Sequence, residues 1–182
     1  EYPEYLIKGY RYEEELRYGE NPHQKAVFYS HPLENQYQMQ QLHGKPLSYN
    51  NYNDIKAAVD LVREFDKPAA VAVKHANPCG AAVGNNIFEA YSKAYETDEI
   101  SIFGGIVALN REVDEKTAQK MNEIFLEIIV APGFSEQASA LLTQKKNLRL
   151  IEMPQTAEKI KDGNSLRQSL DGMLIQEKDN QT

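Results

Sequence analysis

Lys74 and His75 stand side by side at the end of a short apolar run, and their side chains suit acid–base chemistry. The run, residues 69–73, is too short for a helix and is typical of a buried strand; an Asn-Pro pair and a glycine then predict a turn. Ligands of open α/β sheets bind outside the carboxyl ends of strands. A His can take a proton from an amine and a neighbouring Lys can stabilise an oxyanion, so the pair suits acyl transfer to an amine. A Lys lying along a strand end beside a hydrogen-bonded turn His is the alternative interpretation.

The sequence LRYGENPHQ at 16–24 combines turn residues with side chains that an anionic ligand requires. Arg17 can bind a phosphate through its planar guanidinium, and Tyr18 and His23 stand in the same loop. An ordinary polar turn is the alternative for this segment.

Three further residues are candidates because of their places in the chain. Asn51 precedes the expected N-cap of a helix at Asn53, and it could instead point its amide into a site. Gly104 interrupts an apolar run, where a glycine indicates either a bulge or a backbone that a ligand approaches closely. Glu127 stands just before another apolar run, where it is either a solvated charge or an acceptor for an amine or a ring nitrogen.

Several classes of function are disfavoured. The net charge of −7 argues against a nucleic-acid partner, because phosphate-backbone binding requires a positive surface. No glycine-rich dinucleotide fingerprint follows a strand. The turn at 75–80 superficially resembles the zinc deaminases, but Asn77 stands where these need a Glu and Cys79 is the only cysteine, so we expect a metal-free site. Cys79 could be a nucleophile, although a small buried residue is the more usual role of a lone cysteine.

The single cysteine excludes an intrachain disulfide and favours a cytoplasmic protein. No apolar segment approaches the roughly 18 residues of a membrane span. The chain begins with Glu1 rather than Met and ends in a polar stretch, residues 176–182, so we expect a piece of a longer polypeptide.

Strands and helices alternate along the expected order of elements. This order predicts crossover connections and a three-layer α/β/α fold around a mainly parallel mixed sheet. The expected strands are 26–29, 37–42, 69–73, 101–109, 128–131 and 148–151, and the expected helices are 53–65, 87–95, 114–125 and 135–142. We expect a lead-in segment with a ligand-binding loop at 1–24, one α/β/α subdomain at 25–152 and a connecting segment at 153–182.

Five separated motifs together resemble one family. They are LRYGENPHQ, PLSYNNYND, VAVKHANPCGAA, SIFGGIVALNREVD and EIIVAPGF, in this order between about Leu16 and Leu150. They are similar to the N-terminal part of the transformylase region of the bifunctional AICAR transformylase/IMP cyclohydrolase family. The resemblance implies a cytidine-deaminase-like subdomain.

The resemblance also implies an activity. Members transfer the formyl group of 10-formyltetrahydrofolate to the 5-amino group of AICAR in de novo purine biosynthesis, and they also have IMP cyclohydrolase activity. AICAR and the folate co-substrate are the implied partners, without a metal, and a homodimer with the active site near its interface is implied.

Eight residues match functional positions of the family. His75 matches the proton acceptor and Lys74 the catalytic lysine, while Glu127 falls where some members carry the shorter Asp. The implied catalytic residues are His75, Lys74, Asn51 and His23, and the implied substrate-binding residues are Arg17, Tyr18, Gly104 and Glu127.

The cyclohydrolase domain and the second half of the transformylase unit are not represented in this sequence. We therefore expect the chain to fold and to be poorly active or inactive alone. The alternative is a non-catalytic half-domain that binds a nucleotide or a folate, or that only completes the fold of a second half.

Overall fold

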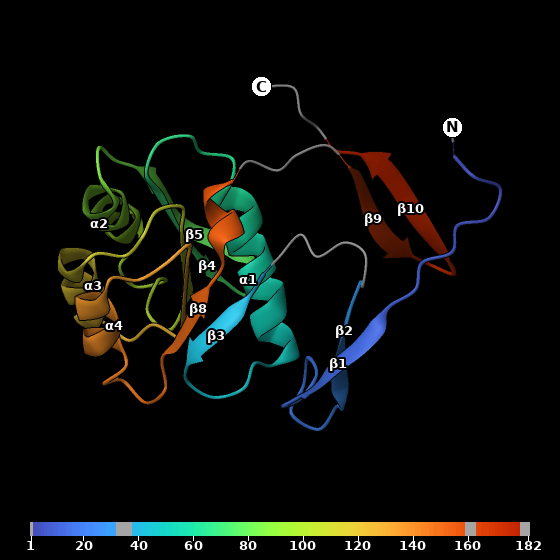
Figure 1. Cartoon of the computed structure of the whole chain (residues 1–182), viewed down its shortest axis with the longest axis horizontal. Coiled ribbons are helices and arrows are strands. Elements are labelled where there is room, and N and C mark those ends of the chain that lie inside the picture. The colour runs from blue at the N-terminus through green and yellow to red at the C-terminus, as the bar shows by residue number, and fades with distance from the viewer. Residues whose placement is uncertain (1, 32–37, 159–162, 179–182) are drawn as a thin grey trace.

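A six-stranded mixed sheet forms the centre of the molecule, as seen in a computed structural model that describes residues 2–31, 38–158 and 163–178 (Figure 1). The strand order is β3-β8-β7-β6-β4-β5. The strands are β3 (Gln40–His43), β4 (Ala69–Lys74), β5 (Asn77–Val83), β6 (Ile106–Leu109), β7 (Ile128–Ala131) and β8 (Arg149–Glu152).

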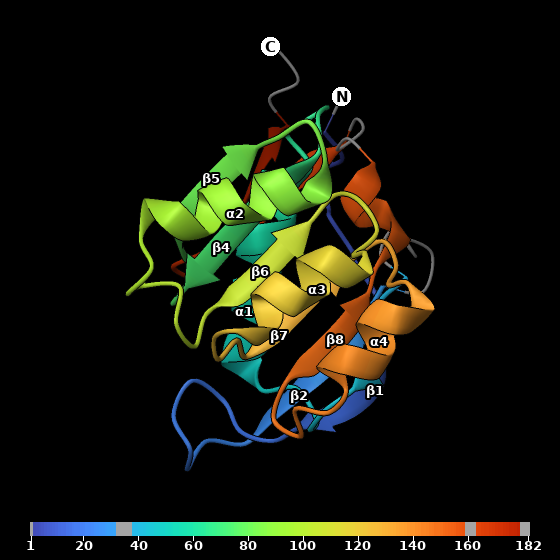
Figure 2. The ribbon, with the colours of Figure 1, turned by 90° about the vertical axis from the view of Figure 1, so that its left-hand side faces the viewer.

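Helices cover both faces of this sheet, which confirms the expected three-layer α/β/α fold. Figure 2 shows α2, α3 and α4 in front of the sheet and α1 behind it. The helices are α1 (Tyr49–Val62) on one side, and α2 (Ile87–Thr97), α3 (Glu115–Asn122) and α4 (Glu136–Leu142) on the other.

Alternate residues of the central strands enter two separate hydrophobic clusters. In β4, Ala70 and Ala72 pack toward α2, whereas Val71 and Val73 pack toward α1. A strand that is buried on both faces consists of a continuous apolar run. This explains why β4 and β7 are recognisable in the sequence without a polar–apolar alternation.

The sheet is mixed, as expected, but it is less parallel than expected. Parallel pairing is confined to β6, β7 and β8, while β4 runs antiparallel to both β5 and β6. The turn predicted at the Asn-Pro pair lies just before it, at His75 and Ala76. Asn77 and Pro78 instead begin β5, which is an edge strand, where a proline removes no essential ladder hydrogen bond.

Two of the expected boundaries are wrong for physical reasons. The N-cap of α1 is Ser48 rather than Asn53: the Asn51 N–H donates to Ser48 Oγ (3.3 Å) and the Ser48 N–H donates to Asn51 Oδ1 (3.0 Å). This reciprocal capping box starts the helix earlier than expected. The strand expected over 101–109 begins only at Ile106, because Gly104 has a positive φ of 73° and turns the chain.

Two hairpins lie apart from the main sheet, on the side that α1 covers (Figure 1). The first contains the expected strand 26–29 and a strand that was not expected. The second lies in the polar region after residue 153, where no element was expected. The strands are β1 (Arg11–Leu16), β2 (Ala26–Ser30), β9 (Asn164–Ser169) and β10 (Gly172–Glu177), and a short 3₁₀ helix spans Pro154–Ala157.

The strand expected over 37–42 appears as β3, beginning at Gln40, and residue 37 lies outside the described residues. Throughout the described ranges, no helix is both long and apolar enough to cross a membrane.

Candidate functional site

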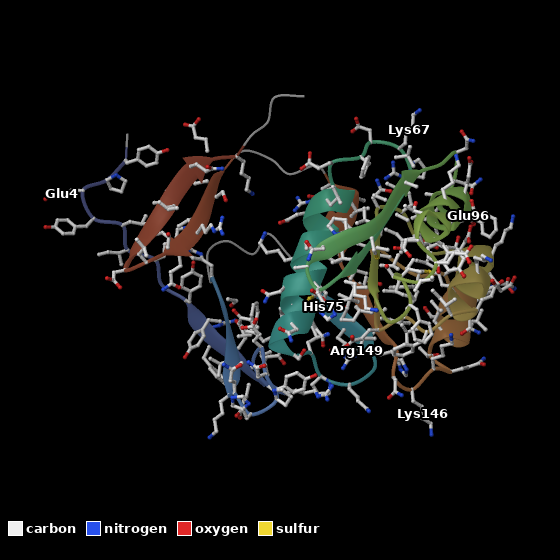
Figure 3. The ribbon with its side chains drawn as sticks, turned by 180° about the vertical axis from the view of Figure 1, so that it is seen from behind. Glu4, Lys67, His75, Glu96, Lys146 and Arg149 are labelled. Atoms are coloured by element: carbon white, nitrogen blue, oxygen red, sulfur yellow. The ribbon has the colours of Figure 1, made fainter. Side chains whose placement is uncertain are left out.

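Most of the candidate residues meet at one edge of the sheet. The register places Val73 beside Ile106, Ile106 beside Ile128, and Ile128 beside Arg149. Because β4 is antiparallel to β6, the carboxyl end of β4 and the amino ends of β6, β7 and β8 share this edge. His75 and Arg149 both lie there (Figure 3). We call it the β4-end edge.

The location differs from the general expectation for α/β sheets. The site faces the amino ends of the parallel strands, and the antiparallel strands β3 and β4 bring their carboxyl ends to it. The rule about carboxyl ends applies to sheets built from right-handed parallel crossovers. Here β4 runs antiparallel to its neighbour β6, so the carboxyl end of β4, with the Lys-His pair, lies at the amino ends of the parallel strands.

Lys74 and His75 lie where β4 turns into β5. His75 and Ala76 form the two-residue connection, and both have positive φ values, 52° and 57°. The side chain of His75 is exposed. Lys74 Nζ donates to the carbonyl oxygen of Phe103 at 3.0 Å, so the ammonium lies over the segment that contains Gly104. This bond uses one of the three ammonium protons, and among the described residues the other two have no acceptor, so they can donate to a ligand.

Glu127 is the centre of a second group at the same edge. Its Oε1 accepts from Asn51 Nδ2 at 3.0 Å and from Arg149 Nη1 at 3.3 Å. Asn51 is buried, and its Oδ1 is already held by the capping box, so the amide has a fixed orientation. The structure therefore joins the expected residues Asn51 and Glu127.

Arg149 is a member of this group that the sequence analysis missed. It is 4% exposed, and its Nε donates to the carbonyl oxygen of Lys45 at 2.9 Å. Burial lowers the pKa of the Arg149 guanidinium, while the charge of Glu127 opposes this shift. The available signal was the same as for Glu127: a charge immediately before or at the start of an apolar strand.

The Arg17–Tyr18 loop is attached beside this group. The Arg17 N–H donates to the carbonyl oxygen of Leu47 (3.4 Å), and the Tyr49 N–H donates to that of Tyr18 (3.2 Å). The Arg17 guanidinium lies 5.2 Å from the centre of the Tyr18 ring. Its positive charge also contributes to the lowered pKa of Arg149, as expected for two neighbouring cations.

Gly104 lies between the Lys-His pair and Glu127. Its N–H donates to the carbonyl oxygen of Phe125 at 2.8 Å, and the Glu127 N–H donates to that of Gly105 at 2.9 Å. The left-handed backbone of Gly104 is a conformation that other residues adopt at a cost. The expected close approach of backbone to ligand is possible here, because Gly104 presents no side chain.

His23 is the one expected catalytic residue that the described structure does not connect to the others. It is exposed in the turn of residues 19–24, which the Gly19 N–H closes by donating to the carbonyl oxygen of Gln24 at 2.8 Å. Among the described residues, no contact joins His23 to another candidate. Its supporting role stays a prediction.

Asp54 connects α1 to the turn at His75 and Ala76 and is not among the eight expected site residues. Its Oδ1 accepts from the Ala76 N–H at 2.7 Å. Burial raises the pKa of the Asp54 carboxyl, and the charge of Glu127 adds to the shift, while the Ala76 N–H and His75 oppose it. The charges of His75 and Glu127 therefore both act on the Asp54 carboxyl, in opposite directions.

Cys79 is half-buried against the α2 side of the core. Burial raises the pKa of its thiol, and the charge of Asp98 adds to this. A raised pKa disfavours the thiolate that a nucleophile or metal ligand requires. Within the described ranges, no three His, Cys, Asp or Glu side chains are grouped to hold a metal ion.

An open groove of about 1130 Å³ lies elsewhere, between the β1–β2 hairpin and α1. Its lining includes Tyr29, Tyr52 and Met153 and none of the eight residues expected to act. At the β4-end edge, His75 is exposed, and Lys74 and Glu127 are partly exposed.

Comparisons with known proteins give the family. The profile of the "AICARFT/IMPCHase bienzyme" family matches residues 1–182. The chain is 54% identical to the bifunctional purine biosynthesis protein PurH of Thermoanaerobacter sp. (strain X514) over 181 residues, and 56% identical to that of Shouchella clausii (strain KSM-K16) over 182 residues. Each alignment covers 98% of this chain and 35% of the relative.

Among solved structures, the apo dCMP deaminase of the cyanophage S-TIM5 is similar with a TM-score of 0.43 and 9% identity, over 52% of this chain and 93% of that one. The chain spans about a third of the length of the PurH relatives that it matches. The match to the whole sequence and the identity above one half decide the assignment. The chain belongs to the AICARFT/IMPCHase bienzyme family.

Proposed function

We propose that the β4-end edge is part of the site that transfers the formyl group of 10-formyltetrahydrofolate to the 5-amino group of AICAR. The observation that supports this most strongly is the meeting of two groups at one edge. The first is the Lys74–His75 pair, and the second is Glu127 with its two donors, Asn51 and Arg149. The first group suits acid–base catalysis, and the second suits recognition of an amide-bearing ligand.

His75 is the proposed general base. The amine nitrogen of AICAR attacks the formyl carbon, and a carbon–nitrogen bond forms to give a tetrahedral oxyanion. His75 takes the proton that the amine nitrogen releases. The bond from the formyl carbon to the folate nitrogen then breaks, and that nitrogen receives a proton as tetrahydrofolate leaves.

Lys74 is the proposed stabiliser of the oxyanion. Its bond to the carbonyl oxygen of Phe103 holds the ammonium in place and leaves two N–H donors. A fixed positive charge at the point where negative charge develops is the usual basis of such stabilisation.

Nucleotide binding is assigned to the remaining residues. Arg17 binds the phosphate with Tyr18 beside it, and the backbone of Gly104 contacts the nucleotide. Glu127 receives both protein donors on Oε1, and no described residue donates to its Oε2. Oε2 is therefore free to accept an N–H of the ligand.

A non-catalytic half-domain that binds a nucleotide or a folate is the second candidate. The exposure of His75 favours it, because catalysis by desolvated charges requires a site from which water is excluded. In this case the ligand would bind equally well without the imidazole of His75.

The test compares two reactions in the complete polypeptide that carries this chain. One assay follows AICAR-dependent release of tetrahydrofolate, and the other follows ring closure of formyl-AICAR to IMP. We expect His75→Ala to lower formyl transfer by about 10²–10⁴-fold, the contribution of a general base, and to leave ring closure unchanged. His31→Ala is the control. His31 packs against Tyr10 and follows the carboxyl end of β2, whereas Arg17 lies near the amino end of β2.

Loss of ring closure with intact formyl transfer would assign the edge to the other activity of the family. Absence of formyl transfer from the wild type, with AICAR still bound, would support the half-domain. We also propose that the complete enzyme is a homodimer with this edge near its interface; sedimentation as a monomer at assay concentrations would contradict this.

A further inference from the structure

The proposed chemistry does not explain why the turn at His75 and Ala76 adopts its unusual backbone conformation. His75 and Ala76 both adopt the left-handed region, with φ values of 52° and 57°. Residues other than glycine avoid this region because Cβ crowds the following carbonyl oxygen. Two-residue hairpins of this type normally contain Asn-Gly or similar pairs. An outside contact must therefore hold this turn.

Asp54 makes that contact. Its Oδ1 accepts from the Ala76 N–H at 2.7 Å, and the backbone N–H of His75 also stabilises its carboxylate. On the other side of the turn, Asn77 Nδ2 donates to the carbonyl oxygen of His75 at 2.8 Å. The turn is thus held by one acceptor from α1 and one donor from β5.

Capping does not explain Asp54. It lies in the second turn of α1, and the N-cap and the first turn are completed by Ser48 and Asn51. Aspartate is a poor residue inside a helix, because its short side chain competes for backbone groups. Asp54 is half-buried and directed at the turn rather than at its own helix.

We propose that Asp54 is a positioning residue: its carboxylate clamps the backbone of the His75–Ala76 turn and so fixes the direction in which the imidazole meets the substrate. Asp54 acts through the backbone and touches no reacting atom. The inference rests on the proposed function, because positioning matters for rate only if His75 takes the proton.

The kinetic test uses Asp54→Ala and Asp54→Asn in the complete polypeptide. Asp54→Ala should lower kcat for formyl transfer by about 10- to 100-fold, as expected for a displaced catalytic group, with KM for AICAR unchanged. Asp54→Asn keeps an oxygen acceptor for the Ala76 N–H and should restore most of kcat. The control is Asp60→Ala on the same helix, whose carboxylate pairs with Lys56 and should have no effect.

A double-mutant cycle separates positioning from general destabilisation. If Asp54 acts through His75, Asp54→Ala should have no further effect on kcat in the His75→Ala background. Independent, multiplying losses would overturn the proposal, and so would wild-type kcat in Asp54→Ala or equal losses in the Ala and Asn variants.

A measurement without turnover keeps the two proposals distinguishable. In the amide NMR spectrum of the 182-residue chain, the Ala76 N–H should show a strong hydrogen bond that Asp54→Ala removes and Asp54→Asn keeps. If this holds while the wild-type enzyme shows no formyl transfer, the proposed function fails and the clamp stands. If the Ala76 amide signal is the same in the wild type and in Asp54→Ala while formyl transfer proceeds, the proposed role of Asp54 is wrong and the proposed function stands.

Discussion

Glu127 receives two donors on a single carboxylate oxygen, one from a helix and one from a neighbouring strand. The Arg149 side chain is 5% exposed, whereas the Glu127 side chain is 38% exposed. A buried charge that loses its partner is costly, so both members depend on the pair. Arg149 is therefore as important as Glu127 itself for directing the other carboxylate oxygen, Glu127 Oε2, at a ligand.

Replacing Arg149 by Met should weaken both stability and substrate binding. The change removes the hydrogen bonds to Glu127 and to the carbonyl oxygen of Lys45, so we expect a loss of about 1–3 kcal/mol of unfolding free energy. KM for AICAR should also rise, because Glu127 loses its fixed position. Denaturant unfolding and steady-state kinetics measure the two effects.

Arg111→Met is the matched control. Arg111 donates to two backbone carbonyl oxygens, those of Asn110 and Asp66, and it follows the carboxyl end of β6, away from the β4-end edge. It should lose stability without a change in KM. Equal KM values for wild type and Arg149→Met would show that the ion pair does not support the ligand site.

Asp54 predicts a pH dependence of stability with a definite sign. Its pKa is raised from the ordinary 3.8, mainly by burial, so the folded state binds this proton more tightly than the unfolded state. The stability that this gives is present below the unfolded pKa and is lost as the pH rises through the folded pKa. Relative to Asp54→Asn, the wild type should therefore lose stability as the pH rises above about 3.8.

Parallel denaturant titrations of the two proteins between pH 3 and pH 5.5 measure this difference. A wild type that gains stability relative to Asp54→Asn over the same interval would mean that the Ala76 N–H and His75 outweigh burial. The sign would then be reversed.

The start of α1 links secondary structure to the site at the scale of the element. Ser48 and Asn51 cap the helix reciprocally, and this leaves Asn51 Nδ2 directed at Glu127. Ser48→Ala should cost about 1 kcal/mol, as is usual for a lost N-cap, and should also raise KM for AICAR because Asn51 loses its orientation. Thermal or denaturant unfolding and kinetics together test this.

Ser135→Ala provides the comparison, because Ser135 caps α4 by accepting from the Ala138 N–H on the opposite face of the sheet. Its loss of stability should be similar and its KM normal. If both variants left KM unchanged, the capping box would have only a structural role.

Gly104 tests whether the loop before β6 must approach a ligand. A Cβ would meet only the Phe125 ring, at an ordinary 3.7 Å, so Gly104→Ala has room and its cost comes from φ. We expect a loss of about 1–2 kcal/mol from the left-handed backbone, with a further loss of AICAR affinity measured by calorimetry. Gly133→Ala, which has room and no positive φ, should keep both stability and affinity.

The elements that sequence predicted best are those with a single dominant signal. The strands β4 and β7 are continuous apolar runs, and α3 and α4 follow their N-caps Asp114 and Ser135, the residues at which the two helices were expected to start. The β4–β5 hairpin could not be predicted in this way, because its turn residues have no local preference for a positive φ. Their conformation depends on Asp54, which is distant in sequence.

In the candidate site, too, single residues could be predicted from local sequence, whereas their contacts could not. Glu127 could be singled out because a charge precedes an apolar run, and Asn51 because it stands near a helix start. Their mutual contact, and the contact with Arg149, depend on strand order, which local sequence does not determine. The resemblance to a family implied the roles of these residues, and the order of the strands brings them together.

At the scale of the whole molecule, two hydrophobic clusters on opposite faces of the sheet support independent folding. We expect the isolated 182-residue chain to unfold cooperatively in denaturant. Because it spans about a third of the length of its relatives and its His75 is exposed, we also expect its formyl transfer to be at least about 10²-fold slower than that of the complete polypeptide. Equal rates for the two would show that the chain contains the complete site.

The most direct test of the central claim is the single-turnover rate constant for formyl transfer from 10-formyltetrahydrofolate to AICAR, measured for the complete polypeptide with and without His75→Ala. The account predicts a fall of about 10²–10⁴-fold, the value expected for a lost general base, and partial recovery when imidazole is added. A rate constant equal to that of the wild type would contradict the assignment of His75 and move the chemistry away from the β4-end edge.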